Sequence, residues 1–97
     1  MNQAGTYGAV LHYLHAAQAA KGGDSAAVMR ALRARPINDF MTKDGTIRSD
    51  GRVLRDMYLF QVKTPADSKK AWDFYQLKDT IPASVAFRPQ EQGGCAL

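Results

Sequence analysis

Cysteine is almost absent from this 97-residue sequence, in which Cys95 is the only one. A single cysteine excludes a disulfide within the chain and a zinc site built from several thiolates. In an exported parent protein, Cys95 would pair with a cysteine elsewhere or remain a free thiol. Long hydrophobic runs are missing too, since none approaches the roughly 20 apolar residues that cross a bilayer. The opening residues MNQAGTYGAV lack a basic stretch followed by an apolar one, so they predict no signal peptide in this chain.

Concentrated charge is also lacking. The formal net charge is +4, but lysine and arginine are spread along the chain without a dense cluster. A nucleic-acid surface needs basic residues gathered on one element with aromatic residues between them. We therefore expect a solvated surface and no nucleic-acid partner. The composition, 45% hydrophobic and 23% charged, is that of a globular chain rather than a disordered one.

Residues 43–52, KDGTIRSDGR, contain two Asp-Gly pairs that resemble part of a calcium loop. Such a loop needs oxygen ligands at alternate positions and a closing Glu. After Asp44, the alternate positions hold Thr46, a weak ligand, and Arg48, a cation, and no closing acid follows. Asp tolerates the left-handed region and Gly enters it freely, so the two pairs predict tight turns between strands.

Other patterns of catalytic and metal-binding residues are missing as well. His12 and His15 lie three residues apart in a helical stretch, but no third ligand follows on that face to complete a zinc set. The serines lack the glycines of a nucleophile elbow, and no motif pairs a general acid with a base. We therefore predict no catalytic residue, no metal ligand and no cofactor, and a chain that is not an enzyme.

The first third of the chain predicts two helices. Between Ala4 and Lys21 the apolar residues recur at the spacing of a helix with one buried stripe: Tyr7, Val10, Leu11, Leu14 and Ala17. The sequence KGG at residues 21–23 supplies a C-terminal stop. A second helix is predicted from Asp24 or Ser25 to Arg35, with Val28, Met29 and Leu32 buried, before Pro36 ends it. The short loop favours antiparallel helices.

After Pro36 the pattern changes to strands. Residues 37–42 predict a short strand, and residues 52–63, RVLRDMYLFQVK, predict a long one with apolar residues on both faces. A polar connection follows, and residues 72–80 predict another strand. One helical turn and a tail complete the chain. We expect an α/β chain, α+β when taken alone, in which two helices precede a few strands.

These elements leave apolar surface uncovered. A strand with two apolar faces and an amphipathic helix need a larger sheet and further helices to cover them, yet the sequence supplies about three strands. We therefore expect an incomplete domain. The missing cover comes either from the rest of a longer polypeptide or from a second copy through exchange of elements.

Three features together resemble one family: the helix start Thr6-Tyr7-Gly8-Ala9-Val10, the turn Asp50-Gly51-Arg52 before a strand ending DMYLFQVK, and a cysteine near the C-terminus. They resemble the C-terminal quarter of the leucine-binding-protein-like receptors of branched-chain amino-acid ABC importers, which have the type I periplasmic binding fold. The resemblance covers essentially the whole chain. It implies an incomplete part of a bilobed receptor that captures a small ligand and delivers it to an ABC permease in the membrane.

The resemblance also implies a location and a ligand class. The full-length parent would be periplasmic and would bind an amino acid or a related small carboxylate, aromatic acids included. The family's first-lobe loops, which hold the amino and carboxylate groups of the ligand, have no counterpart in these residues. The alternative is a small self-associating structural domain, an intertwined homodimer without ligand binding of its own.

The resemblance divides the chain into three parts. Residues 1–35 form a helical hairpin in one lobe, residues 36–63 a short strand, turns and a strand that crosses the hinge, and residues 64–97 a second-lobe strand and tail. The implied ligand-binding residues are Asn2, Gln3, Thr6 and Tyr7. Tyr7 is also predicted as the first core residue of its helix, and Asn2 and Gln3 as a frayed terminus. The hinge-crossing residues are Met57, Tyr58, Leu59, Phe60 and Gln61.

Overall fold

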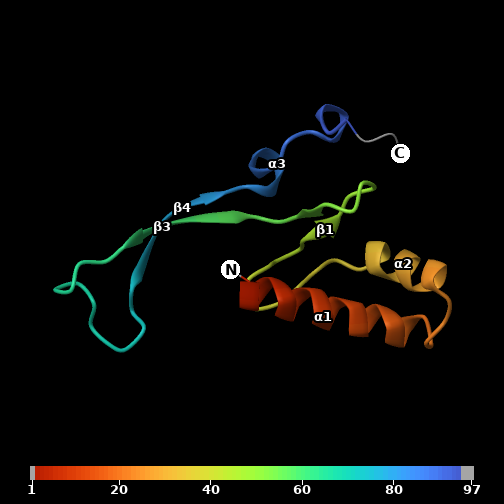
Figure 1. The fold of residues 1–97 in the computed structure, drawn as a ribbon, viewed down its shortest axis with the longest axis horizontal. Helices are drawn as coiled ribbons and strands as arrows, with labels where there is room; N and C mark the ends of the chain where they lie inside the picture. Colours follow the sequence, from red (N-terminus) through yellow and green to blue (C-terminus); the bar gives the residue numbers. More distant parts are fainter. Residues whose placement is uncertain (1, 95–97) are drawn as a thin grey trace.

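The computed structural model describes residues 2–94 and contains helices and two separate two-stranded sheets (Figure 1). Cys95 lies outside the described residues. The elements, in chain order, are α1 Asn2–Ala19, α2 Ser25–Ala34, β1 Thr46–Ile47, β2 Val53–Leu54, β3 Met57–Val62, β4 Tyr75–Ile81, α3 Ala83–Ala86 and the 3₁₀ turn η1 Gln90–Gln92. Within the described part, no helix is long and apolar enough to cross a membrane.

Both predicted helices are confirmed, and local signals set their ends. The N–H of Gly22 donates to the carbonyl of Ala17 at 2.9 Å and that of Lys21 to Gln18 at 3.1 Å, which is the Schellman pattern of a helix C-terminus. Asp24 caps α2, because its Oδ1 accepts from the backbone N–H of Ala27 at 2.9 Å. Figure 1 shows α2 running back along α1.

The buried face of α1 is not the predicted one. Tyr7, Val10 and Leu14 are each more than half exposed, whereas His12 and Ala16 are buried. The reason is that α2 packs against the side of α1 that holds His12 and Ala16. There the Nε2 of His12 lies 2.9 Å from the carbonyl of Leu32 and donates to it. Periodicity therefore identified the helix, and the large apolar stripe was wrongly assigned to its buried side.

The predicted strand over residues 37–42 is wrong. Only Ile37 pairs, as an isolated bridge with Gly45. Asp39 ends the extended segment, because its Oδ1 accepts from the backbone N–H groups of Met41 at 2.8 Å and Thr42 at 2.7 Å. A side chain that bonds its own following backbone favours a turn over a strand.

Of the two predicted Asp-Gly turns, the second is confirmed as a tight turn between strands, whereas Asp44 and Gly45 end a loop that begins after Ile37. Asp44 has φ 52° and Gly51 has φ 82°, both in the left-handed region. The second turn closes the hairpin of β1 and β2, in which Thr46 pairs with Leu54 and Ile47 with Val53. The last backbone hydrogen bond of this hairpin runs from the N–H of Arg48 to the carbonyl of Arg52 at 2.9 Å. It leaves a three-residue loop with Gly51 in the left-handed position.

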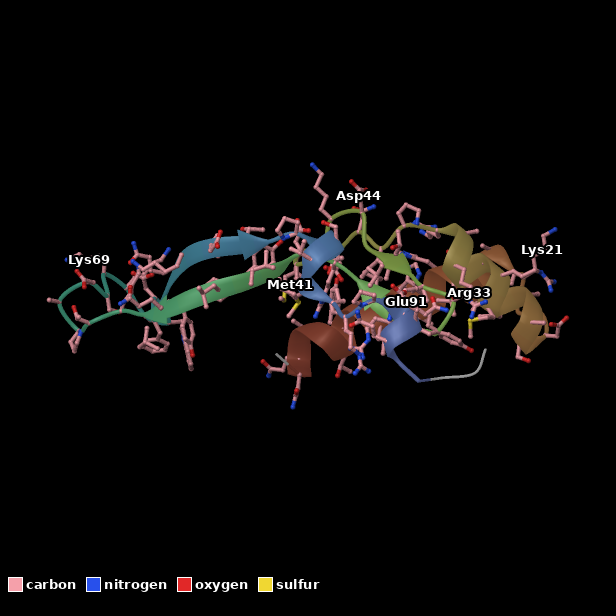
Figure 2. The ribbon with its side chains drawn as sticks, turned by 90° about the horizontal axis from the view of Figure 1, so that it is seen from above. Lys21, Arg33, Met41, Asp44, Lys69 and Glu91 are labelled. Carbon is pink, nitrogen blue, oxygen red and sulfur yellow. The ribbon has the colours of Figure 1, made fainter. Side chains whose placement is uncertain are left out.

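The predicted long strand over residues 52–63 is wrong as a single element. It divides at Arg55 and Asp56 into β2 and β3, which belong to different sheets. Strand β3 pairs antiparallel with β4, and a bulge leaves Lys78 without a partner opposite Leu59 and Phe60. Strand β4 begins at Tyr75 rather than residue 72. The β3–β4 ribbon extends away from the helices, and within residues 2–94 no other element lies over its faces (Figures 1 and 2).

The chain has little core. The described residues bury only Ala16, Val28 and Ile37 among apolar side chains, and no large side chain is fully buried. The radius of gyration is 16.8 Å, whereas a compact chain of this length has about 12.5 Å. The accessible surface is 7571 Å², so it exceeds the roughly 5,500 Å² of a compact 10.6-kDa monomer by about 2,000 Å². The expectation of uncovered apolar surface is therefore confirmed.

Candidate functional site

An open hollow lies between α1, the β1–β2 hairpin and the segment after α3. Its volume is about 1070 Å³. The α1 wall combines the small residues Gly5, Gly8 and Ala9 with His12 and Tyr13. Ile47, Val53 and Phe87 contribute apolar surface from the other sides. Small residues on a helix let another backbone approach closely. We name this hollow the central concavity.

Arginines surround the central concavity. Arg48 binds Asp50 with two hydrogen bonds, Nε to Oδ1 at 2.9 Å and Nη2 to Oδ2 at 2.5 Å. This paired geometry lowers the pKa of Asp50 to about 2, with a further contribution from the N–H of Arg52. The same hydrogen bonds raise the pKa of Arg48. Arg48 also donates from Nη1 to the carbonyl of Arg88 at 3.0 Å and so links the hairpin to the C-terminal segment.

Two further arginines are held around the concavity by different contacts. The guanidinium of Arg52 lies 5.9 Å from the centre of the Phe87 ring, within cation–π range. Arg55 donates from Nη1 to Thr42 Oγ1 at 3.3 Å. The lining of the concavity contains four arginines but only two acidic residues, Asp39 and Asp50. The arginines are Arg48, Arg52, Arg55 and Arg88. This lining favours an occupant with carboxylate groups at its edges.

A narrow cleft of about 90 Å³ lies beside α1 and contains both histidines of the chain. It passes between Gly8 and Asp39, where a Cβ atom added to Gly8 would lie 2.5 Å from Asp39 Oδ2. The Nε2–H of His12 already donates to the carbonyl of Leu32. Across residues 2–94, no three His, Cys, Asp or Glu side chains gather to hold a metal ion. The cleft is lined by α1 on one side and by residues 35–39 on the other.

The implied ligand residues lie together at the start of α1. Asn2, Gln3, Thr6 and Tyr7 are all exposed and span an arc of about 140° on the helix surface. Tyr7 packs edge-on against Phe40, with ring centroids 5.3 Å apart. These residues do not line either hollow described above. They form one exposed polar and aromatic surface, which we name the α1 start surface.

The implied hinge residues, Met57, Tyr58, Leu59, Phe60 and Gln61, lie in β3 and pair with β4. Tyr58 donates its hydroxyl to the carbonyl of Met41 at 3.4 Å, at the base of the ribbon. Directly before them lies the break at Arg55 and Asp56. There the Oδ1 of Asp56 accepts from the N–H of Ala83 at 2.9 Å and so joins the break to the start of α3.

The sequence contained an unused signal for the arginine cluster. The spacing Arg48-Ser49-Asp50-Gly51-Arg52 places two arginines at the ends of a three-residue hairpin loop with an aspartate inside it. Taken by itself, Arg48 excludes a calcium loop but does not indicate a cluster. The contacts with Arg88 and Phe87 link residues about 35 to 40 positions apart, and local spacing does not predict such contacts.

Known proteins resemble this chain in sequence and in structure. The family described as periplasmic binding protein matches residues 1–70. The crystal structure of a periplasmic binding protein from Burkholderia mallei is 45% identical, with a TM-score of 0.83 over 92% of this chain and 24% of that one. A branched chain amino acid ABC transporter periplasmic ligand-binding protein from Burkholderia xenovorans is 42% identical, with a TM-score of 0.86 over 94% and 24%.

The extent of these matches bears on the exposed surface. The chain spans about a quarter of the length of the two solved structures. Among proteins of curated function, no relative matches it. The fold is thus a partial piece of the fold that those structures contain, which agrees with the uncovered ribbon and the open central concavity. By sequence and by structure, the chain belongs to the periplasmic binding protein family.

Proposed function

We propose that this chain acts as the C-terminal part of a periplasmic receptor that binds an amino acid or related small carboxylate for ABC-type uptake. The observation that carries the proposal is the combination of 42–45% identity with 92–94% coverage of this chain but 24% coverage of its relatives. The surplus of about 2,000 Å² supports it, because a standard interface takes only about 800 Å² from each partner.

The central concavity is the place where the rest of the receptor would pack. The small residues of α1 allow a strand or helix to approach closely, and the arginines around the concavity can donate hydrogen bonds to carboxylates at the edges of that element. Arg48 is oriented by Asp50 and Arg88 rather than left free, so the opening has a defined shape. In this proposal the concavity is an interior surface of the receptor, and the ligand binds elsewhere.

Ligand contact is assigned to the α1 start surface. Asn2, Gln3 and Thr6 offer amide and hydroxyl groups, and Tyr7 offers a ring and a hydroxyl. The edge-on contact with Phe40 fixes the Tyr7 ring without covering it, since Tyr7 remains half exposed. These groups can hydrogen-bond a small carboxylate ligand and stack against an aromatic one. The partner that receives the ligand is a membrane permease.

We place the hinge of the receptor at Arg55 and Asp56, directly before the implied hinge residues. Residues 57–61 are held by pairing with β4, whereas Arg55 and Asp56 belong to neither sheet. A short unpaired segment absorbs a change of backbone angles more readily than a paired strand. Asp56 would limit the motion through its bond to Ala83.

A chimera tests the receptor proposal. In the B. xenovorans protein, this chain replaces the matching quarter, and thermal unfolding is followed with branched-chain amino acids and aromatic acids. We expect a folded chimera whose melting temperature rises with one ligand class, because a ligand that binds only the folded form stabilises it. Tyr7→Phe keeps the Phe40 contact and removes the hydroxyl, and Val10→Ala on the same helix is the matched control. A folded chimera without ligand response would refute the proposal.

Self-association of the isolated chain is the second candidate. One observation favours it: the β3–β4 ribbon is exposed on both faces, with Val62 69% and Leu59 55% accessible. An isolated two-stranded ribbon is marginally stable in water, and added strands stabilise it. Light scattering on the 97-residue chain tests this candidate, because a monomer at every concentration would refute it.

A further inference from the structure

The two edges of the β3–β4 ribbon differ in composition. Strand β3, MYLFQV, contains no charged residue, no Pro and no Gly. Strand β4, YQLKDTI, has Lys78 in the bulge and Asp79 beside it. Lysines, bulges and charges are the features that keep an edge strand from pairing with another chain. The β4 edge is therefore protected, and the β3 edge is open.

The outward backbone groups of the β3 edge can be assigned. The N–H of Lys63 donates to the carbonyl of Phe74 at 2.8 Å, so residue 63 bonds toward β4. In an antiparallel pair, every second residue bonds to a given neighbour. The backbone N–H and C=O groups of Phe60 and Val62 therefore point away from β4. Val62 pairs directly with Tyr75, whose own backbone groups point to the opposite, protected edge.

We propose that the open β3 edge pairs antiparallel with the β3 edge of a second copy of this chain, giving a four-stranded sheet in the order β4–β3–β3–β4. This inference rests on self-association, the second candidate above, and names its surface. The pairing is self-complementary, so a two-fold axis near Phe60 satisfies both copies at once. Assembly stops at two copies because each outer edge is a protected β4.

The proposal also explains why the ribbon is stable enough to extend from the helices. Two strands alone are marginal, while four strands with one apolar face reach the size of an independently stable sheet. In β3 and β4, Tyr58, Phe60 and Val62 share a face with Tyr75 and Leu77, through the pairs Phe60 with Leu77 and Val62 with Tyr75. Pairing two ribbons through β3 places the aromatic face of each next to that of the other.

Proline at two cross-paired positions provides the test. Proline removes an N–H, and at either Val62 or Tyr75 the lost N–H makes no bond within the ribbon. Light scattering and sedimentation of the 97-residue chain should give twice 10.6 kDa. Val62→Pro should raise the dissociation constant roughly 30-fold or more, because a symmetric interface loses two hydrogen bonds at once. Tyr75→Pro, the matched control, should leave it unchanged.

Hydrogen exchange provides the second readout. The amides of Phe60 and Val62 should exchange more slowly as the protein concentration rises, while that of Tyr75 should not respond. A dimer that is equally sensitive to both prolines would place the contact elsewhere, and open-ended assembly would show that β4 does not stop growth. Either result overturns this inference and leaves self-association standing. A monomer would refute both, and the receptor proposal would be decided separately by the chimera.

Discussion

Substituting Gly8 by alanine should loosen the contact between α1 and the loop after Pro36. An added Cβ would lie 2.5 Å from Asp39 Oδ2, roughly 0.9 Å inside ordinary contact distance. The carboxylate cannot move aside freely, because its Oδ1 holds the amides of Met41 and Thr42 at 2.8 and 2.7 Å. Both oxygens belong to one planar group, so displacing Oδ2 also displaces Oδ1.

The magnitude follows from two opposing terms. Two hydrogen bonds to a carboxylate contribute about 3 kcal/mol together, taken at the low end because the site is only partly buried. Replacing Gly by Ala inside a helix stabilises the helix by about 1 kcal/mol. The net loss of global stability is about 2 kcal/mol. The helix term acts on α1 alone, so the loop itself loses about 3 kcal/mol, which corresponds to roughly 160-fold faster exchange of the Met41 and Thr42 amides when the local opening equilibrium governs exchange.

Native-state hydrogen exchange is the assay, and the chain supplies its own control. A Cβ at Gly5, one turn earlier on α1, would meet no atom within 4 Å. Gly5→Ala should therefore leave the Met41 and Thr42 amides unchanged and slightly stabilise the helix. In an Asp39→Ala background, Gly8→Ala should become stabilising, because only the helix term remains. Slower exchange of these amides in Gly8→Ala would refute the reasoning.

Two further predictions concern a cap and an ion pair. Asp24→Ala should destabilise α2 by about 1 kcal/mol, because the Ala27 N–H loses its acceptor. Asp24→Asn should retain most of the capping stability. Amide exchange in the first turn of α2 measures both effects. The pKa of Asp50 is lowered from 3.8 to about 2, so its stabilisation is fully present above about pH 4 and is lost as the pH falls toward 2. A carboxyl-carbon NMR titration of Asp50 measures this, and Asp50→Asn should make the β1–β2 hairpin insensitive to pH in that range. A midpoint near 3.8 would show that the Arg48 pair does not persist in solution.

The sequence predicted the features that are decided locally. The end of α1 follows from KGG, the start of α2 from Asp24, and the β1–β2 turn from the second Asp-Gly pair, since each involves residues within a few positions. The buried face of α1 could not be predicted in this way. Periodicity ranks Tyr7, Val10 and Leu14 above Ala16, but two helices approach most closely where side chains are small.

The strands were less predictable because side chains compete with strand pairing. Asp39 curls residues 39–42 through its bonds to Met41 and Thr42, although the composition of the stretch favours a strand. Asp56 bonds the N–H of Ala83, 27 residues later, and the strand breaks beside it. The same division between local and long-range information applies to the candidate site. The α1 start surface came from family resemblance, while the central concavity depends on long-range contacts such as Arg48 with Arg88.

The location of the exposed apolar residues separates the two proposed assemblies. Pairing through β3 adds strands to the ribbon but leaves the α1 stripe of Tyr7, Val10 and Leu14 in water, because that stripe belongs to a different element. A complete receptor supplies cover to both. A dye that fluoresces on apolar surface should therefore still bind the dimer of the 97-residue chain and should bind the folded chimera weakly. Val10→Ser should reduce dye binding to the dimer and leave the dimer intact. If the dimer bound no dye, the stripe would be covered by the second copy, and exchange of α1 rather than β3 pairing would account for self-association.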